Sequence, residues 1–305
     1  MEDLTSLAAH RRSIERLIPL LDAIRSVAEI AWRRADQALA PLAVYEDRLG
    51  GLLQEVVGSL DREERRQLLA TGRTPGPTGL LLVTSERGLC GGFNHRLVQN
   101  GVEEARALAA QGQEVRILCL GRRGLQILES MHQPVLRGWP LSSVGVPAYL
   151  DVEQVALDLL ELVEHGQIGS LLAIHNAPAS RFEYGRRRRE LLPPRLDVPA
   201  SSPTPVGARR SRMRIKPRGE TRNLVTHLLA EHLLVQLYRV IAESVVSEQL
   251  ARIQAMRLAV ENARGILDKL TLEYTVASRQ AMTSALLEIT TGYELAQRSQ
   301  PARSH

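Results

Sequence analysis

The stretch ARIQAMRLAVENARGILDKL, residues 251–270, carries an apolar side chain at every third or fourth position. It belongs to a longer segment, 221–291, that contains no proline and a single glycine, Gly265. This spacing is typical of a helix with one apolar seam, as in a coiled coil. At about 1.5 Å per residue the helix would be on the order of 100 Å long, too long to bury its seam in a small domain. The seam consists of Ile253, Met256, Val260, Ala263, Leu267, Leu270, Tyr274, Ala277 and Ala281.

The N-terminal region shows the same spacing of three and four residues, with alanines in the middle that would let a partner helix approach closely. Pro19 and Pro41 should bend this helix, since proline lacks a backbone donor and clashes with the preceding turn. Each buried large apolar side chain contributes roughly 1.5–3 kcal/mol, so we predict that the two seams pair as an antiparallel coiled coil. The N-terminal seam consists of Ile14, Leu17, Leu21, Ile24, Ala28, Ala31, Ala35, Ala38, Leu42, Tyr45, Leu49, Leu52 and Val56.

The middle of the chain has a different pattern, which begins after a segment rich in glycine and proline at 71–79. Short apolar runs at 80–85, 115–121 and 170–178 alternate with helical patterns at 94–110, 122–131 and 151–165. This alternation predicts a small, Rossmann-like α/β domain with a mostly parallel sheet, inserted between the two long helices. The expected fold class is therefore α/β with dominant helix. The expected divisions are an N-terminal coiled-coil helix at 1–70, the α/β domain at 77–192, a basic, proline-rich linker at 193–220, a C-terminal coiled-coil helix at 221–297 and a tail at 298–305.

Composition supports a helical globular protein, since 44% of the 305 residues are hydrophobic and only 3% are aromatic. Two cysteines cannot form a disulfide framework, so we expect both to be reduced. The N-terminus is acidic, and no apolar stretch approaches the roughly 20 residues of a membrane span. We therefore expect a cytoplasmic chain without a transmembrane segment.

A glycine-rich loop, SERGLCGGFNHRL at 85–97, follows the first apolar run. A Walker phosphate loop needs a lysine and a hydroxyl after its last glycine, and Gly92 is followed by Phe93 and Asn94 instead. The dinucleotide fingerprint GxGxxG is also absent, so we expect no bound nucleotide or other cofactor. Cys90 is interpreted as a small buried residue, although an activated thiol at a helix start is the alternative that an enzyme would need. The glycines then serve a tight turn.

Other candidate sites have plain structural explanations. The eight histidines show no ligand spacing, since His227 and His232 are five residues apart, so we expect no metal site. The arginine run at 186–189 is interpreted as a solvated loop or one that faces an acidic partner. Four glutamates on the C-terminal helix, Glu243, Glu248, Glu261 and Glu288, are interpreted as members of surface ion pairs. A rival hypothesis is a scaffold that grips RNA or acidic lipid through the arginines at 186–189 and 209–218.

Three motifs resemble those of a known family. The segment Thr84–Asn94 closely resembles the (S/T)(S/T)(D/E)RGLCGG(L/F)N motif of the gamma subunit of F-type ATP synthases. Residues 247–263 follow that family's SEQxARxxAMxxAxxNA pattern. Thr283, Leu286, Glu288, Ile289 and Gly292 follow its terminal ITxELxEIxxG pattern. Three motifs in the right order identify the chain as similar to this family over most of its length.

The resemblance implies a rotor shaft. In this family the paired terminal helices enter a hexamer of alternating alpha and beta subunits, and the α/β domain forms a foot near an epsilon-like subunit and the membrane c-ring. The shaft transmits torque between the ion-driven ring and the catalytic beta subunits, and is itself not catalytic. The implied location is the cytoplasmic face of the cell membrane, as a peripheral protein, with no nucleic acid partner.

The resemblance also implies roles for individual residues, with departures from the family's pattern. The usual lysines are absent at Leu17–Ile24, Ala285 and Tyr293 replace common residues, and Arg279 and Gln280 lie one residue late. One residue turns a side chain about 100° on a helix, which suggests a divergent shaft. The implied rotor–stator contacts are Arg33, Arg279, Gln280, Thr283 and Glu288. The implied foot-domain motif is Arg87, Gly88, Leu89, Cys90, Gly91, Gly92 and Asn94. The implied packing residues are Ile24, Ala28, Ala31, Ala35, Met256, Val260, Ala263 and Leu267.

Overall fold

A computed structural model describes residues 2–59, 76–141, 145–180, 182–194 and 220–298. The chain divides into two units, Met1–Val27 with Gln254–His305, and Ala28–Ile253. Two long helices contribute to both units, α1 (Glu2–Ser59) and α6 (Glu220–Arg298). Helix α1 is assigned as one helix through Pro19 and Pro41. Most of the expected linker (195–219 of 193–220), most of the expected tail (299–305 of 298–305) and the last residues of the expected N-terminal helix (60–70) lie outside the described residues.

The unit Ala28–Ile253 contains a five-stranded sheet with the order β3-β2-β1-β4-β5. The first four strands in this order are parallel, and β5 is antiparallel to β4, so the prediction of a mostly parallel sheet is confirmed. Strands β3 and β5 were not expected from the sequence. The strands are β1 (Thr78–Val83), β2 (Val115–Leu120), β3 (Val135–Trp139), β4 (Ser170–Pro178) and β5 (Tyr184–Leu192).

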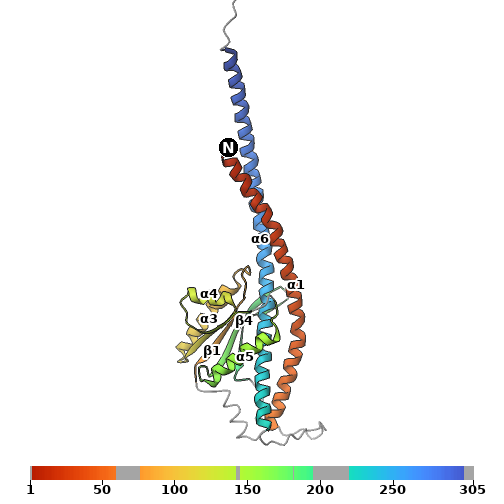
Figure 1. The fold of residues 1–305 in the computed structure, drawn as a ribbon, viewed down its shortest axis with the longest axis vertical. Helices are drawn as coiled ribbons and strands as arrows, with labels where there is room; N and C mark the ends of the chain where they lie inside the picture. Colours follow the sequence, from red (N-terminus) through yellow and green to blue (C-terminus); the bar gives the residue numbers. More distant parts are fainter. Residues whose placement is uncertain (1, 60–75, 142–144, 181, 195–219, 299–305) are drawn as a thin grey trace, which may run out of the picture. The chain divides into compact units, whose positions relative to one another are not determined.

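Helices cover both faces of this sheet, as Figure 1 shows. The strands alternate between the two faces: Leu80 and Leu82 face α3 (Phe93–Ala110) and α4 (Arg122–Ser130). Leu81 and Val83 face the opposite side, where α5 (Tyr149–Glu164) and α6 pack. Side chains on the two sides of a strand point in opposite directions, so runs such as the one at 80–83 must be apolar throughout when both faces are covered.

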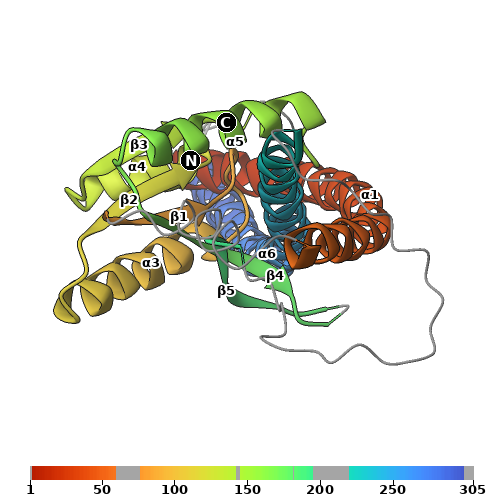
Figure 2. The same ribbon diagram turned by 90° about the horizontal axis from the view of Figure 1, so that it is seen from below.

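The arginine run at 186–189 lies in β5, so its assignment to a loop is wrong. Among the described strands β5 pairs with β4 alone and forms an edge of the sheet, where charged side chains are tolerated. Every second residue turns toward α1 and α6: Arg187 contacts Glu243, and Arg189 contacts Glu46. Figure 2 shows β4 and β5 beside α6. On the other face of the strand Arg188 pairs with Glu104 of α3. Three of the four arginines are therefore paired with a carboxylate within the chain, which weakens the RNA or lipid hypothesis; the cluster at 209–218 lies outside the described residues.

In this unit α1 and α6 pack side by side in antiparallel order, with Leu53, Val56 and Val57 against Val225. The expected seam is wrong at two positions, since Tyr45 and Leu52 are about half exposed. Their neighbours Glu46 and Leu53 are buried instead. An α-helix has about 3.6 residues per turn, so a strict spacing of three and four drifts off the contact line over several turns.

The unit formed by Met1–Val27 and Gln254–His305 pairs the start of α1 with the C-terminal part of α6. The Arg11 guanidinium lies 5.0 Å from the centre of the Tyr274 ring. On α1 the expected seam residue Leu17 is 43% exposed, and its neighbour Ile18 is more buried. Beyond Tyr274 every described residue of α6 from 279 to 293 is exposed. The apolar residues exposed there are Met282, Leu286, Leu287, Ile289 and Tyr293.

The sequence predicted no transmembrane segment. By length and composition alone, the part of α6 between Leu224 and Tyr293 could nevertheless cross a membrane. However, 44% of its most apolar window is buried within the chain. Leu233, Leu237 and Ile241 belong to the same core as the sheet and α5. A core helix of a globular protein passes the same composition test, and we interpret α6 as such a helix.

Close packing of α4 on the sheet predicts the effect of one glycine substitution. A Cβ at Gly124 would lie 2.5 Å from Thr84 Oγ1 and 2.7 Å from Cys119 Sγ. We expect Gly124→Ala to lower the free energy of unfolding by about 1–3 kcal/mol, because the buried neighbours cannot give way. Gly51→Ala on α1 is the control, since no atom lies within 4 Å of its Cβ, and it should stabilise by about 0.5–1 kcal/mol. Denaturant unfolding of both variants gives the comparison; equal midpoints would contradict the packing.

Candidate functional site

The loop of residues 84–94, here called the motif loop, is a tight turn between β1 and α3 held by its own polar groups. The Ser85 backbone N–H donates to Asn94 Oδ1 at 2.9 Å, and Asn94 Nδ2 donates to Ser85 Oγ at 2.7 Å. The Ser85 hydroxyl donates to the Arg87 carbonyl at 2.6 Å. Leu89 and Gly91 have φ angles of 65° and 58°, so the chain reverses sharply before α3 begins. The glycines serve this turn.

Helix α6 closes over the motif loop. Arg252 Nη2 donates to the Gly88 carbonyl at 3.1 Å and to Glu248 Oε1 at 2.6 Å. Ala251 packs against Cys90 and Phe93 in a small buried cluster. The two sequence motifs, one in the loop and one in the long helix, therefore form a single contact.

The first residues of the motif loop are held by the segments that follow β2 and β3. The Glu86 carboxylate accepts hydrogen bonds from the backbone N–H groups of Arg122 and Leu141, at 3.1 and 3.0 Å. It also forms an ion pair of 2.9 Å with the Arg122 side chain. With contacts to α4, to the segment after β3 and to α6, the loop is a packed structural turn.

Both cysteines are buried and poorly suited to nucleophilic chemistry. Burial raises the pKa of the Cys90 thiol, and it raises the pKa of Cys119 to about 12. A reactive cysteine needs the opposite, a lowered pKa and access to solvent. The geometry argues against the hypothesis of a Cys90 nucleophile.

Alkylation tests this interpretation. Iodoacetamide at pH 7.5 should label neither cysteine of the folded chain within the time that labels a free thiol fully, because the thiolate is disfavoured and covered. Both should react once the chain is unfolded in denaturant. Mass spectrometry of each peptide measures the labelling, and rapid modification of native Cys90 would restore the nucleophile hypothesis.

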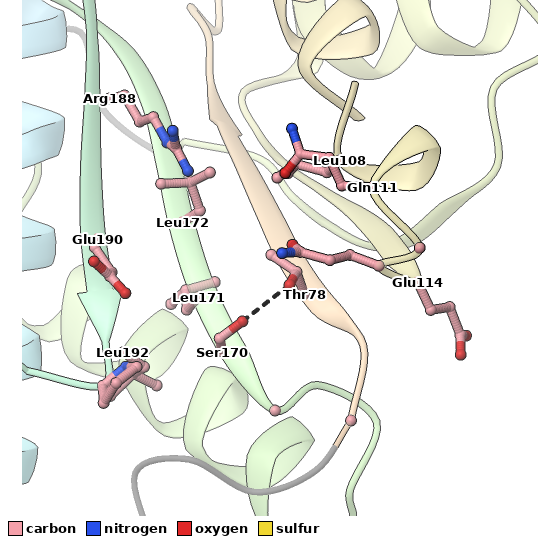
Figure 3. Close-up of a pocket in the computed structure, with 15 residues that line it drawn as sticks. Thr78, Leu108, Gln111, Glu114, Ser170, Leu171, Leu172, Arg188, Glu190 and Leu192 are labelled. Atoms are coloured by element: carbon pink, nitrogen blue, oxygen red, sulfur yellow. Dashed lines mark hydrogen bonds between the residues drawn. The ribbon is translucent and has the colours of Figure 1, made fainter. Parts of the chain in front are cut away.

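A cavity of about 660 Å³ lies at the opposite end of the strands, where β1, β2 and β4 begin. Figure 3 shows Thr78 and Ser170 turned toward each other, joined by a hydrogen bond of 3.1 Å. Arg188 and Glu190 line another wall with opposite charges. Arg188 belongs to the arginine run singled out from the sequence, but the charges around the cavity do not converge on a ligand of one sign.

The expected rotor–stator residues are divided between the two units. Arg279, Gln280, Thr283 and Glu288 are exposed on the C-terminal part of α6. Thr283 Oγ1 donates to the Arg279 carbonyl, a bond within the helix. Arg33 is exposed on α1 in the other unit, beside a hollow of about 560 Å³ formed with the β4–β5 turn and α6.

The expected packing residues differ in burial. Those most fully buried are Ala28, Ala35, Met256, Val260 and Ala263. Ile24, Ala31 and Leu267 are half-buried.

The interpretation of Glu243 as a surface residue is wrong. Its carboxylate is buried and accepts hydrogen bonds from His175 Nε2 at 2.8 Å and Arg239 Nε at 3.0 Å. Glu248 is also largely covered, in its pair with Arg252, whereas Glu261 and Glu288 are exposed. Sequence reasoning also missed His175, although a histidine within the apolar run at 170–178 was a signal that a polar partner lay nearby.

The charges around Glu243 set its protonation. Burial raises the pKa of this carboxyl, but hydrogen bonds from His175 and Arg239 and the charge of Arg187 outweigh it and hold the pKa at about 2. Burial lowers the pKa of His175, which is therefore neutral at pH 7 and donates its Nε2 proton to Glu243. Burial likewise lowers the pKa of His232 on α6.

These shifts predict how stability depends on pH. The unfolded chain binds protons at histidine near pH 6.5, while the buried His175 and His232 resist protonation. The free energy of unfolding should therefore be constant at higher pH and fall as the pH drops below about 6.5. The stability from Glu243 persists above its ordinary pKa of 4.5 and is lost toward pH 2. Denaturant titrations at pH 7.5 and 5.5 measure the histidine part, and His175→Gln should reduce the difference; an equal or larger difference contradicts the assignment.

Among the described residues there is no group of three or more His, Cys, Asp or Glu side chains that could hold a metal ion.

Known proteins resemble the chain over nearly its whole length. A family model described as ATP synthase matches residues 3–295. The ATP synthase gamma chain of Sinorhizobium fredii is 27% identical over 296 residues, which cover 96% of this chain and 99% of that protein. The gamma chain of Trichlorobacter lovleyi is 27% identical over 294 residues, with the same coverage.

Solved structures share the fold. A chain of the Euglena gracilis mitochondrial ATP synthase, in a cryo-EM structure of OSCP/F1/c-ring, matches with a TM-score of 0.64 and 14% identity, covering 100% of this chain and 99% of that one. A chain of the Tetrahymena thermophila central stalk and c-ring structure matches with a TM-score of 0.55 and 18% identity, covering 79% and 99%. Together with the family match over residues 3–295, these findings confirm the resemblance seen in the three motifs. The chain belongs to the ATP synthase gamma-chain family.

Proposed function

We propose that the chain is the central-stalk rotor of a rotary ATP synthase and transmits torque between a membrane ion-driven ring and a catalytic alpha/beta hexamer. The observation that carries this proposal is the apolar surface at the end of α6. Leu286, Leu287 and Ile289 are each about 60–70% exposed in water. Apolar side chains that gather on one surface mark a site that another protein covers. In the proposed assembly, the alpha and beta subunits surround the end of α6 and bury these side chains.

The proposed mechanism needs no catalytic group in this chain. A shaft that presents different side chains to each of three catalytic subunits stabilises a different conformation in each, by as much as the contacts differ. The chain is then a non-catalytic subunit, and the chemistry of ATP takes place in its partners. The buried cysteines and the motif loop without phosphate-binding features agree with that role.

The sheet unit serves as the foot under this proposal. Its motif loop is held by α6 through Arg252, so the foot and the long helix share one contact. We assign the foot to the side of the c-ring and an epsilon-like subunit, at the cytoplasmic face of the cell membrane. The structural relatives come from assemblies of F1 with the c-ring and of the central stalk with the c-ring, which supports this assignment.

We further propose that Arg279, Gln280, Thr283 and Glu288 contact the hexamer near its top and that Arg33 contacts it lower down. All five side chains are exposed. Because Arg279 and Gln280 lie one residue late relative to the family pattern, the upper contacts are rearranged by about a third of a helical turn.

Reconstitution with the cognate alpha and beta chains tests the proposal. A photo-activated cross-linking residue replaces Leu286 on α6 or, as the control, Leu157 on α5; the two side chains are 59% and 55% exposed. We expect a complex whose ATPase activity depends on this chain. Position 286 should cross-link to alpha or beta, because the end of α6 is covered by the hexamer, and position 157 should not.

Two results would overturn the rotor assignment. The first is the absence of any alpha/beta complex that contains the chain. The second is cross-linking to alpha or beta at position 157 with none at position 286.

A further inference from the structure

Six charged or polar side chains connect the two long helices to the sheet within the unit Ala28–Ile253. They come from four elements: Glu46 from α1, Arg239 and Glu243 from α6, His175 from β4, and Arg187 and Arg189 from β5. We call this cluster the ionic joint. Figure 2 shows the elements that supply it side by side.

Arg239 is the centre of the joint, because it bridges two carboxylates. Its Nη1 lies 2.6 Å from Glu46 Oε2, and its Nε lies 3.0 Å from Glu243 Oε1. This bridge ties α1 to α6.

Three further contacts tie the bridged pair to the sheet. His175 Nε2 lies 2.8 Å from Glu243 Oε2, and Arg187 Nη1 lies 3.4 Å from both oxygens of that carboxylate. Arg189 lies 3.3 Å from Glu46. Each glutamate is thus bound both by α6 and by a strand, so neither helix can turn against the sheet without breaking ionic contacts.

Stability alone does not account for the joint. Buried ion pairs stabilise little relative to apolar side chains of the same size, because removing the charges from water offsets their attraction. His175 is completely buried, and its Nδ1 has no hydrogen-bond partner among the described residues. An apolar side chain would pack there without leaving a polar atom unpaired. The contribution of His175 that an apolar residue could not make is therefore the hydrogen bond from its Nε2 to Glu243.

The ionic contacts fix the orientation of α6 on the sheet, which apolar contacts alone do not. The apolar core between α6 and the sheet includes Leu237, Ile241 and Val245, and apolar contacts have no preferred orientation. Hydrogen-bonded ion pairs fix both distance and angle. Arg252, nine residues after Glu243, makes a second directional contact, with the motif loop. At about 1.5 Å per residue the two contacts hold α6 at points some 13 Å apart.

We propose that the ionic joint is the torque coupling between the sheet domain and the helix pair, with Glu243 and His175 as positioning residues that fix the angle of α6 on the sheet. This inference rests on the rotor function proposed above. When the joint is loosened, the helices still turn in the hexamer during ATP hydrolysis, but the sheet follows them incompletely. The consequence is fewer ions moved per ATP at a nearly unchanged rate of hydrolysis.

The test uses the complete ATP synthase in inverted membrane vesicles, with ATP hydrolysis and ATP-driven ion uptake measured on the same sample. His175→Phe keeps the ring packing and removes the donor to Glu243, whereas His175→Gln keeps a donor near the Nε2 position. Glu104→Gln is the matched control, because Glu104 of α3 pairs with Arg188, which belongs to the same strand as Arg187 but is not a member of the ionic joint.

We expect His175→Phe and Glu243→Gln to assemble and to hydrolyse ATP within about twofold of the unchanged chain, with ion uptake per ATP lowered about threefold or more. His175→Gln should restore most of the uptake, and Glu104→Gln should leave it unchanged. A role confined to stability would lower the amount of complex and leave uptake per ATP the same.

The proposal is overturned if His175→Phe assembles with unchanged uptake per ATP, if Glu104→Gln causes the same loss, or if His175→Gln restores nothing. Should His175→Phe and Glu243→Gln fail to assemble, Arg187→Gln decides the matter, since this side chain is half exposed and its loss leaves the core intact. Uptake per ATP must then fall for Arg187→Gln. An unchanged chain that forms no ATPase complex refutes the rotor function itself, which is a different result.

Discussion

The burial of one side of α6 against the sheet is the interaction on which the rest of the structure depends. From Leu233 to Arg252 nearly every side chain of this helix is covered, a degree of burial usual for a core helix and not for an exposed coiled coil. The sheet can bury its second face only because α6 and α5 lie on it. The helix therefore belongs to the core of the α/β unit, and its C-terminal part pairs with the start of α1 in the other unit.

Polar groups give this interface its geometry. Where α6 meets the motif loop, Arg252 binds the Gly88 carbonyl, and where it meets β4 and β5, Glu243 and Arg239 bind the strands and α1. An apolar surface alone would let the helix settle at several angles, since dispersion and hydrophobic contacts are nearly independent of direction. Buried ionic contacts leave one arrangement, because any other one strands a charge. A component that transmits force needs such an interface.

Polar contacts within the fold also explain why the glycine-rich loop, although it resembles a phosphate-binding turn, is not one. The polar side chains of the loop are engaged within the fold: the Asn94 amide binds Ser85, and the Glu86 carboxylate, whose charge would repel a phosphate, accepts hydrogen bonds from the backbone N–H groups of Arg122 and Leu141. Cys90, in the middle of the loop, is packed under Ala251 of α6. The loop's chemistry is directed inward, toward holding the fold, and the function resides in surfaces that other subunits cover.

The sequence by itself determined the two long helices, three of the five strands and the pairing of the chain's ends, because their periodicity is a local property that packing did not override. It also identified the motif loop and its family. Only the tertiary structure decided that Arg186–Arg189 form an edge strand, that Glu46 is buried while Tyr45 is half exposed, and that Glu243 is buried beside His175. The physical reason is that a charged residue is predicted to be exposed unless its partner is known. The partners of Glu46 and Glu243 on other elements lie 56 to 193 residues away along the chain, beyond the range of any local pattern.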